Sequence, residues 1–115
     1  MKIVINADWG GFGLSDAAIQ RYAELAGLNL ISKQDDKFVT FTHWYQDIVD
    51  DDHYWSEHDL ARSDALLVQV IEELGDAANG SFSRLKIVNV PDDITWHIEE
   101  YDGREHVAED HRTWS

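Results

Sequence analysis

The spacing of apolar residues changes repeatedly along this chain, and these changes limit the folds that it can adopt. Short runs with strand character occur at residues 2–6, 28–31, 38–41, 84–90 and 94–99. Two longer segments carry apolar residues three or four positions apart, which is typical of helices. This mixed order predicts an α+β fold, built as one small domain with an antiparallel sheet and two main helices.

Both predicted helices have recognisable ends. Ser15 is a favourable N-cap residue for the first helix, and Gly27 is suited to end it. Ser63 or Asp64 can cap the second helix in the same way. The apolar stripes are Ile19, Tyr22 and Leu25 in the first helix, and Leu67, Val70, Ile71 and Leu74 in the second.

The other segments are expected to form a hairpin and loops. Asp102-Gly103 is a typical two-residue hairpin turn, so residues 104–107 should pair with the preceding strand as a C-terminal β-hairpin. Residues 33–37 are expected to be a polar turn between two strands. Residues 42–61 show no clear period, and we expect an irregular loop with a short helical turn there.

Length and composition indicate one domain over residues 1–115. The chain has no cysteine, which excludes disulfides and thiolate metal sites. It has no apolar run of transmembrane length, and its N-terminus enters a strand pattern without an apolar signal segment. We therefore expect a cytoplasmic protein without a membrane partner.

The formal net charge of −14 is the most unusual property of the chain. A chain with this much negative charge repels nucleic acid, and we therefore expect no nucleic-acid partner. A solvated acidic surface is the simplest interpretation. A halophile-like surface and mimicry of the DNA phosphate backbone, as in a small inhibitor of DNA-binding enzymes, are the alternatives.

Three glycines at positions 10, 11 and 13 separate the first strand from the first helix. Such a loop can hold a phosphate on backbone N–H groups, or it can simply allow a sharp turn. It lacks the residues of a P-loop and the spacing of a dinucleotide fingerprint, so a turn is the favoured interpretation. Trp9 and Phe12 beside the glycines are either core residues or stacking surfaces for a base.

An anionic ligand would depend on few residues, because the chain has only nine basic ones. In the acidic C-terminal segment, Arg112 precedes Trp114 by two residues, a pair that can clamp a phosphate and stack on a base. Arg62 and Arg84 are further candidates, and the amide of Asn79 could recognise a base edge. The complete set of arginine and lysine candidates is Arg62, Arg84, Lys86, Arg104 and Arg112.

His43, His53 and His58 lie among many carboxylates, which raises the possibility of a metal site. Their spacing matches no ligand motif, and no serine lies in a nucleophile motif. We therefore expect neither a functional metal nor a catalytic residue.

Five ordered segments resemble a family of short phage-encoded proteins: KIVIN, GGFGLS, VIEELGDAANG, LKIV-x-VPDD and EYDG-x-E-x-VAE-x-HRTW. The family includes the Thoeris anti-defence protein 1 group, which are sponges for immune signals. The resemblance implies sequestration, without cleavage and without a cofactor, of a cyclic ADP-ribose-type signal or of cyclic oligonucleotides. It also implies a homo-oligomer, a dimer or a hexamer, with ligand near the subunit contacts.

Three functions are thus expected, in order of preference. The first is a nucleotide sponge in an infected bacterial host. The second is an acidic protein-binding inhibitor, for example a DNA mimic. The third is a metal-dependent hydrolase that uses residues 42–59.

Overall fold

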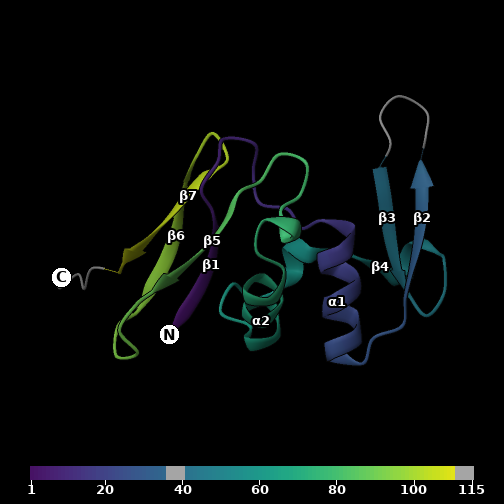
Figure 1. The fold of residues 1–115 in the computed structure, drawn as a ribbon, viewed down its shortest axis with the longest axis horizontal. Coiled ribbons are helices and arrows are strands. Elements are labelled where there is room, and N and C mark those ends of the chain that lie inside the picture. Colours follow the sequence, from purple (N-terminus) through teal and green to yellow (C-terminus); the bar gives the residue numbers. More distant parts are fainter. Residues whose placement is uncertain (36–40, 111–115) are drawn as a thin grey trace.

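The computed structural model describes residues 1–35 and 41–110. Within these residues two α-helices and seven strands form a molecule that measures 49 × 32 × 31 Å. Figure 1 shows the helices in the middle of the long axis, with β1, β5, β6 and β7 at one end and β2, β3 and β4 at the other. The predicted α+β class is confirmed, with three small antiparallel sheets among the described strands.

The sheet of β1 (Lys2–Asn6) and β5 (Leu85–Asn89) is covered on both faces. Val4 pairs with Ile87, and both pack into the core that the helices form. Alternation along β1 turns Ile3 and Ile5 to the opposite face, where both are buried. That face meets the hairpin of β6 (Trp96–Tyr101) and β7 (Arg104–Glu109). The predicted C-terminal hairpin is therefore confirmed.

The two helices are α1 (Asp16–Ala26) and α2 (Ala65–Leu74), and their predicted caps are confirmed. The Ser15 hydroxyl accepts from Ala18 N, and Gly27 ends α1 with φ 70°. Asp64, rather than Ser63, caps α2. The Tyr22 hydroxyl also donates to Asp64 Oδ2 at 2.8 Å, and burial together with this bond raises the pKa of Tyr22 to about 12.

The third sheet, β2 (Leu30–Asp35), β3 (Phe41–Gln46) and β4 (Tyr54–Trp55), corrects part of the sequence analysis. Residues 42–46 and 54–55 are strands, so the expectation of an irregular loop was wrong there. Both faces of β3 carry aromatic or His side chains, so the sequence lacks the alternation of apolar and polar residues that normally indicates a strand. Residues 33–35 extend β2, while 36–40, with the rest of the predicted turn and most of the strand predicted at 38–41, lie outside the described residues.

Short 3-10 helices at Asp51–His53, Glu57–Asp59 and Gly75–Ala78 connect these elements. The expected helical turn within residues 42–61 is thus present, and it occurs twice. Among the residues that the structure describes, no helix combines the length and apolarity needed to cross a membrane.

Candidate ligand-binding cleft

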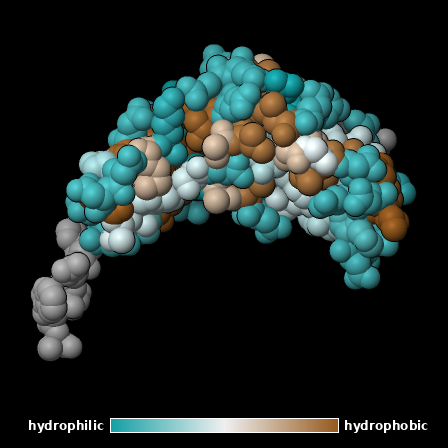
Figure 2. Space-filling view, turned by 90° about the horizontal axis from the view of Figure 1, so that it is seen from below, coloured by the Kyte–Doolittle hydropathy of each residue, from teal (hydrophilic) through white to brown (hydrophobic). Residues whose placement is uncertain are grey.

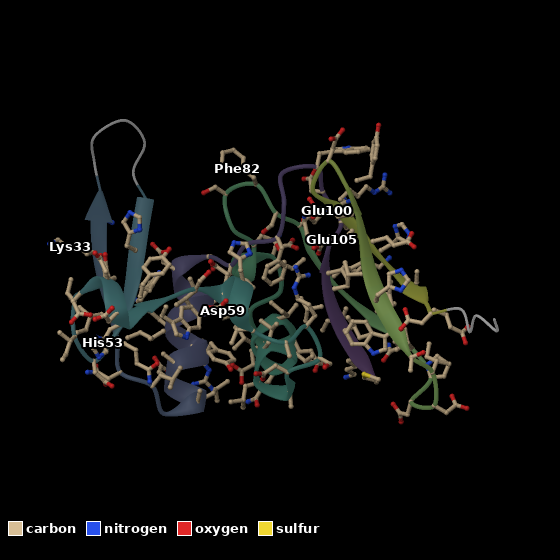
Figure 3. The ribbon with its side chains drawn as sticks, turned by 180° about the vertical axis from the view of Figure 1, so that it is seen from behind. Lys33, His53, Asp59, Phe82, Glu100 and Glu105 are labelled. Carbon is tan, nitrogen blue, oxygen red and sulfur yellow. The ribbon has the colours of Figure 1, made fainter. Side chains whose placement is uncertain are left out.

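A cleft of about 510 Å³ lies between the β1–β5 sheet and the β6–β7 hairpin. This volume is within the usual range of small-molecule sites. Figure 3 labels Glu105, which lies on the hairpin side of the cleft. The lining residues are Ile5, Trp9, Lys86, Val88, Tyr101, Arg104, Glu105, His106 and Val107.

Two exposed aromatic side chains stand at the cleft. Trp9 follows β1 and Tyr101 ends β6, and 54% and 71% of their surfaces are exposed. Their ring centroids lie 5.9 Å apart in an edge-to-face arrangement. The guanidinium carbon of Arg104 lies 5.6 Å from the Trp9 ring centroid. An aromatic ring and a cation therefore lie side by side at the cleft. The ring can stack on a base and the cation can pair with a phosphate of the same ligand.

Arg84 and Lys86 bring further positive charge to this end of the molecule. Leu85 and Ile87 pack into the helical core, so alternation along β5 turns Lys86 toward the hairpin, and Arg84 lies directly before the strand. Among residues 1–35 and 41–110, neither of them has a carboxylate within 4.0 Å, and the same holds for Arg104. In contrast Lys2, Arg21 and Arg62 all pair with glutamates. Of the described cations without a carboxylate partner, Arg84, Lys86 and Arg104 therefore lie at the cleft end of the molecule, and Lys33 lies at the other end.

The carboxylate of Glu105 at the cleft is neutralised by Arg62. The two side chains form a two-bond ion pair at 2.7 and 2.9 Å, and their side chains are 6% and 18% exposed, respectively. The guanidinium carbon of Arg62 also lies 3.6 Å from the centroid of the Phe12 ring, which belongs to the core. Arg62 and Phe12 are therefore together beneath the cleft, and the ligand-binding role expected of them stays a prediction.

Asn6 is not among the predicted site residues, but it organises this region. Asn6 is fully buried, and its side chain makes four hydrogen bonds. Its amide nitrogen donates to the carbonyl oxygens of Asp8 and Gly103, and its Oδ1 accepts from the backbone N–H of Asp8 and Arg84. The sequence does offer a signal for this role: Asn6 is a polar residue at the end of an apolar strand, just before a glycine loop.

The glycine loop provides close contacts between backbones, which supports its interpretation as a turn. A Cβ on Gly10 would lie 2.2 Å from the carbonyl oxygen of Phe82. A Cβ on Gly103 would lie 2.3 Å from Trp9 O and 2.5 Å from Gly11 N. The loop, the segment before β5 and the hairpin turn are thereby held together. Of the two aromatic rings of the loop, Phe12 is buried and Trp9 remains exposed.

Of the remaining predicted site residues, Asn79 lies away from the cleft and Arg84 lies near it. Asn79 lines a second cavity, and its Oδ1 accepts a hydrogen bond from Leu85 N at 2.8 Å. Arg84 donates to the carbonyl oxygen of Ala7, two residues before Trp9, at 3.4 Å. Arg112 and Trp114 lie outside the described residues.

Three titratable side chains of the hairpin, one of them the cleft residue His106, are joined by hydrogen bonds. His97 bonds to Asp110 and Glu99, which holds the pKa of His97 above its ordinary value. Bonds from His97 and His106 hold the pKa of Glu99 below its ordinary value. No group of three or more potential ligand side chains within the described residues is arranged to hold a metal ion.

Comparisons with protein-family models, with curated proteins and with solved structures found no match to this chain. What the chain binds is therefore inferred from the side chains of the cleft. These are two exposed aromatic rings, two cations without a carboxylate partner among the described residues, and a neutralised glutamate.

Proposed function

We propose that this chain binds and sequesters a cyclic ADP-ribose-type signal, or a related cyclic oligonucleotide, without cleaving it. One observation carries the proposal: Lys86 and Arg104 line the same cleft as Trp9 and Tyr101 in a chain with a net charge of −14. Stacking on an aromatic ring and ion pairing with phosphate are the two interactions that nucleotides require. The resemblance to phage anti-defence sponges agrees with this chemistry.

The acidic surface does not oppose such a site. Charges more than a Debye length away, about 8 Å at physiological salt, are largely screened. The carboxylate that lines the cleft, that of Glu105, already pairs with Arg62. Among the lining residues, the net positive charge therefore comes from Lys86 and Arg104, and it favours an anion.

The test is calorimetric titration with cyclic ADP-ribose isomers and a panel of cyclic oligonucleotides. Arg104→Ala is expected to weaken binding by about 1.5–3 kcal/mol, roughly ten- to 150-fold, because a charge-assisted bond is lost. Trp9→Ala should cost a similar amount through lost stacking, about 1–3 kcal/mol. Lys33→Ala removes the same charge as Arg104→Ala at the opposite end of the molecule (Figure 3), so it is the matched control and should bind as the wild type does.

Two further results decide between the candidate functions. Ligand released by heating the complex should be recovered intact by chromatography, whereas a hydrolase would yield fragments. If the wild type binds nothing in the panel, the sponge proposal fails. An acidic inhibitor that binds a basic protein is then the better explanation of the charge of −14.

A further inference from the structure

A second cavity, of about 390 Å³, lies beside the N-terminal end of α1 and shares no lining residue with the cleft. Strands β3 and β4 and residues 79–81 complete its walls. Figure 2 shows apolar and polar residues side by side across the middle of the molecule. The side chains of interest are two carboxylates and three aromatic residues: Asp16, Glu57, Trp44, Tyr54 and Trp55.

Glu57 is a mostly buried carboxylate without a strong partner. Its side chain is 20% exposed. One oxygen accepts from Leu14 N at a long 3.3 Å, and the nearest basic side chain is that of His58, whose Nε2 lies 3.9 Å from the other oxygen. Among residues 1–35 and 41–110, no Lys or Arg lies within ion-pair distance of Glu57. A carboxylate removed from water without a cation is costly, so a cation that enters the cavity gains a favourable interaction.

Asp16 adds a second negative charge at the cavity. Its Oδ2 accepts from the Thr42 hydroxyl at 2.9 Å, and within the described part of the chain it has no Lys or Arg partner either. The N-terminus of α1 would by itself favour an anion, but the Ser15 hydroxyl already caps it and Asp16 places a negative charge in its first turn. Two carboxylates at one cavity therefore disfavour an anion and favour a cation.

The aromatic residues narrow the kind of cation. Trp44 and Trp55 are directly opposite in the register of β3 and β4, and Tyr54 lies next to them. Aromatic ring faces attract cations, and sites that combine several rings recognise methylated ammonium groups. Metal cations prefer several oxygen ligands in a compact shell, and the described residues offer no such group.

We propose that this cavity binds a small methylated ammonium ion, held by Glu57 and Asp16 and packed against Trp44 and Trp55. The net charge of −14 draws such a cation toward the protein, while the cavity selects its shape. This site is independent of the nucleotide cleft, because its residues come from the α1, β3 and β4 side of the molecule.

The test compares choline and tetramethylammonium with 3,3-dimethylbutan-1-ol, the neutral analogue of choline, by calorimetry and tryptophan fluorescence. The two cations are expected to bind saturably, and the neutral alcohol at least roughly tenfold more weakly. Glu57→Gln should weaken choline binding by a similar factor. Asp59→Asn removes the same charge from an exposed position two residues away, and it should change the affinity by less than about twofold.

Asp16→Asn repeats the test at the other carboxylate, so the proposal remains testable if Glu57→Gln does not fold. Arg104→Ala, which alters the nucleotide cleft, should leave choline binding unchanged. Equal binding of choline and the neutral alcohol would overturn the proposal, as would no binding of either cation. Equal losses of choline affinity in Glu57→Gln and Asp59→Asn would overturn it as well. So would a cavity that binds a basic peptide but neither choline nor tetramethylammonium.

Discussion

At the scale of single residues, the Arg62–Glu105 pair makes the strongest prediction. Glu105→Gln keeps the shape of the side chain but leaves the largely buried guanidinium of Arg62 without a counter-charge. Breaking a buried pair in this way typically costs about 3–5 kcal/mol, so the urea midpoint should fall sharply. Glu100→Gln is the control, because Glu100 is exposed directly opposite Glu105 in the hairpin, and it should change stability by less than about 0.5 kcal/mol. Similar losses in both variants would contradict the prediction.

Single residues also show where sequence reasoning stops. Ser15 and Gly27 were predicted correctly, and Asp64 was one of two candidate caps, because a cap depends on a few neighbouring residues. The partner of Arg62 is 43 positions away, and nothing in the local sequence indicates that Glu105 meets it. Asn6 likewise acquires its role from Gly103, at the other end of the chain.

At the scale of elements, the contact between the hairpin turn and the glycine loop depends on Gly103. Its φ of 87° is unfavourable for other residues, and an added Cβ would collide with Trp9 O. Gly103→Ala is therefore expected to cost more than about 1 kcal/mol of stability and to weaken nucleotide binding by displacing Trp9. Gly13→Ala is the control, since a Cβ added to Gly13 would have nothing within 4 Å. Thermal unfolding and titration of both variants check the expectation, and equal behaviour of the two would refute it.

Elements differ in how readily the sequence reveals them. Both helices and the C-terminal hairpin were predicted because their apolar pattern or turn residues are local. Strand β3 was partly missed because His43 and Tyr45 on one face alternate with Trp44 on the other. The two faces therefore differ little in hydrophobicity. The cleft was not predicted at all. It forms where β5 and the hairpin pack together, although Lys86 and Arg104 were among the candidate cations.

At the scale of the whole molecule, we predict a dimer or larger homo-oligomer. Trp9, Tyr54, Phe82 and Tyr101 are exposed, and large exposed aromatic side chains are typical of interaction surfaces. Since each chain carries a charge of −14, association should strengthen as salt rises from about 0.02 to 0.2 M and screens the repulsion. Sedimentation velocity at micromolar concentration measures both effects.

Phe82→Ser tests whether these aromatic side chains mediate association. Phe82 is 72% exposed, and Figure 3 shows it projecting from the loop before β5, so the variant should fold normally and associate more weakly. A single 13.2 kDa species at every salt concentration would rule out the oligomer.

The pairing of β1 with β5 has a consequence for biosynthesis. Asn6 pairs with Leu85, so the ribosome must add roughly 80 residues, about 4–16 s of translation, before β1 meets its partner. During that interval Ile3, Val4 and Ile5, which the folded protein buries almost completely, are exposed in the nascent chain. The core can therefore close only late in translation, and until then this short apolar strand is exposed to aggregation.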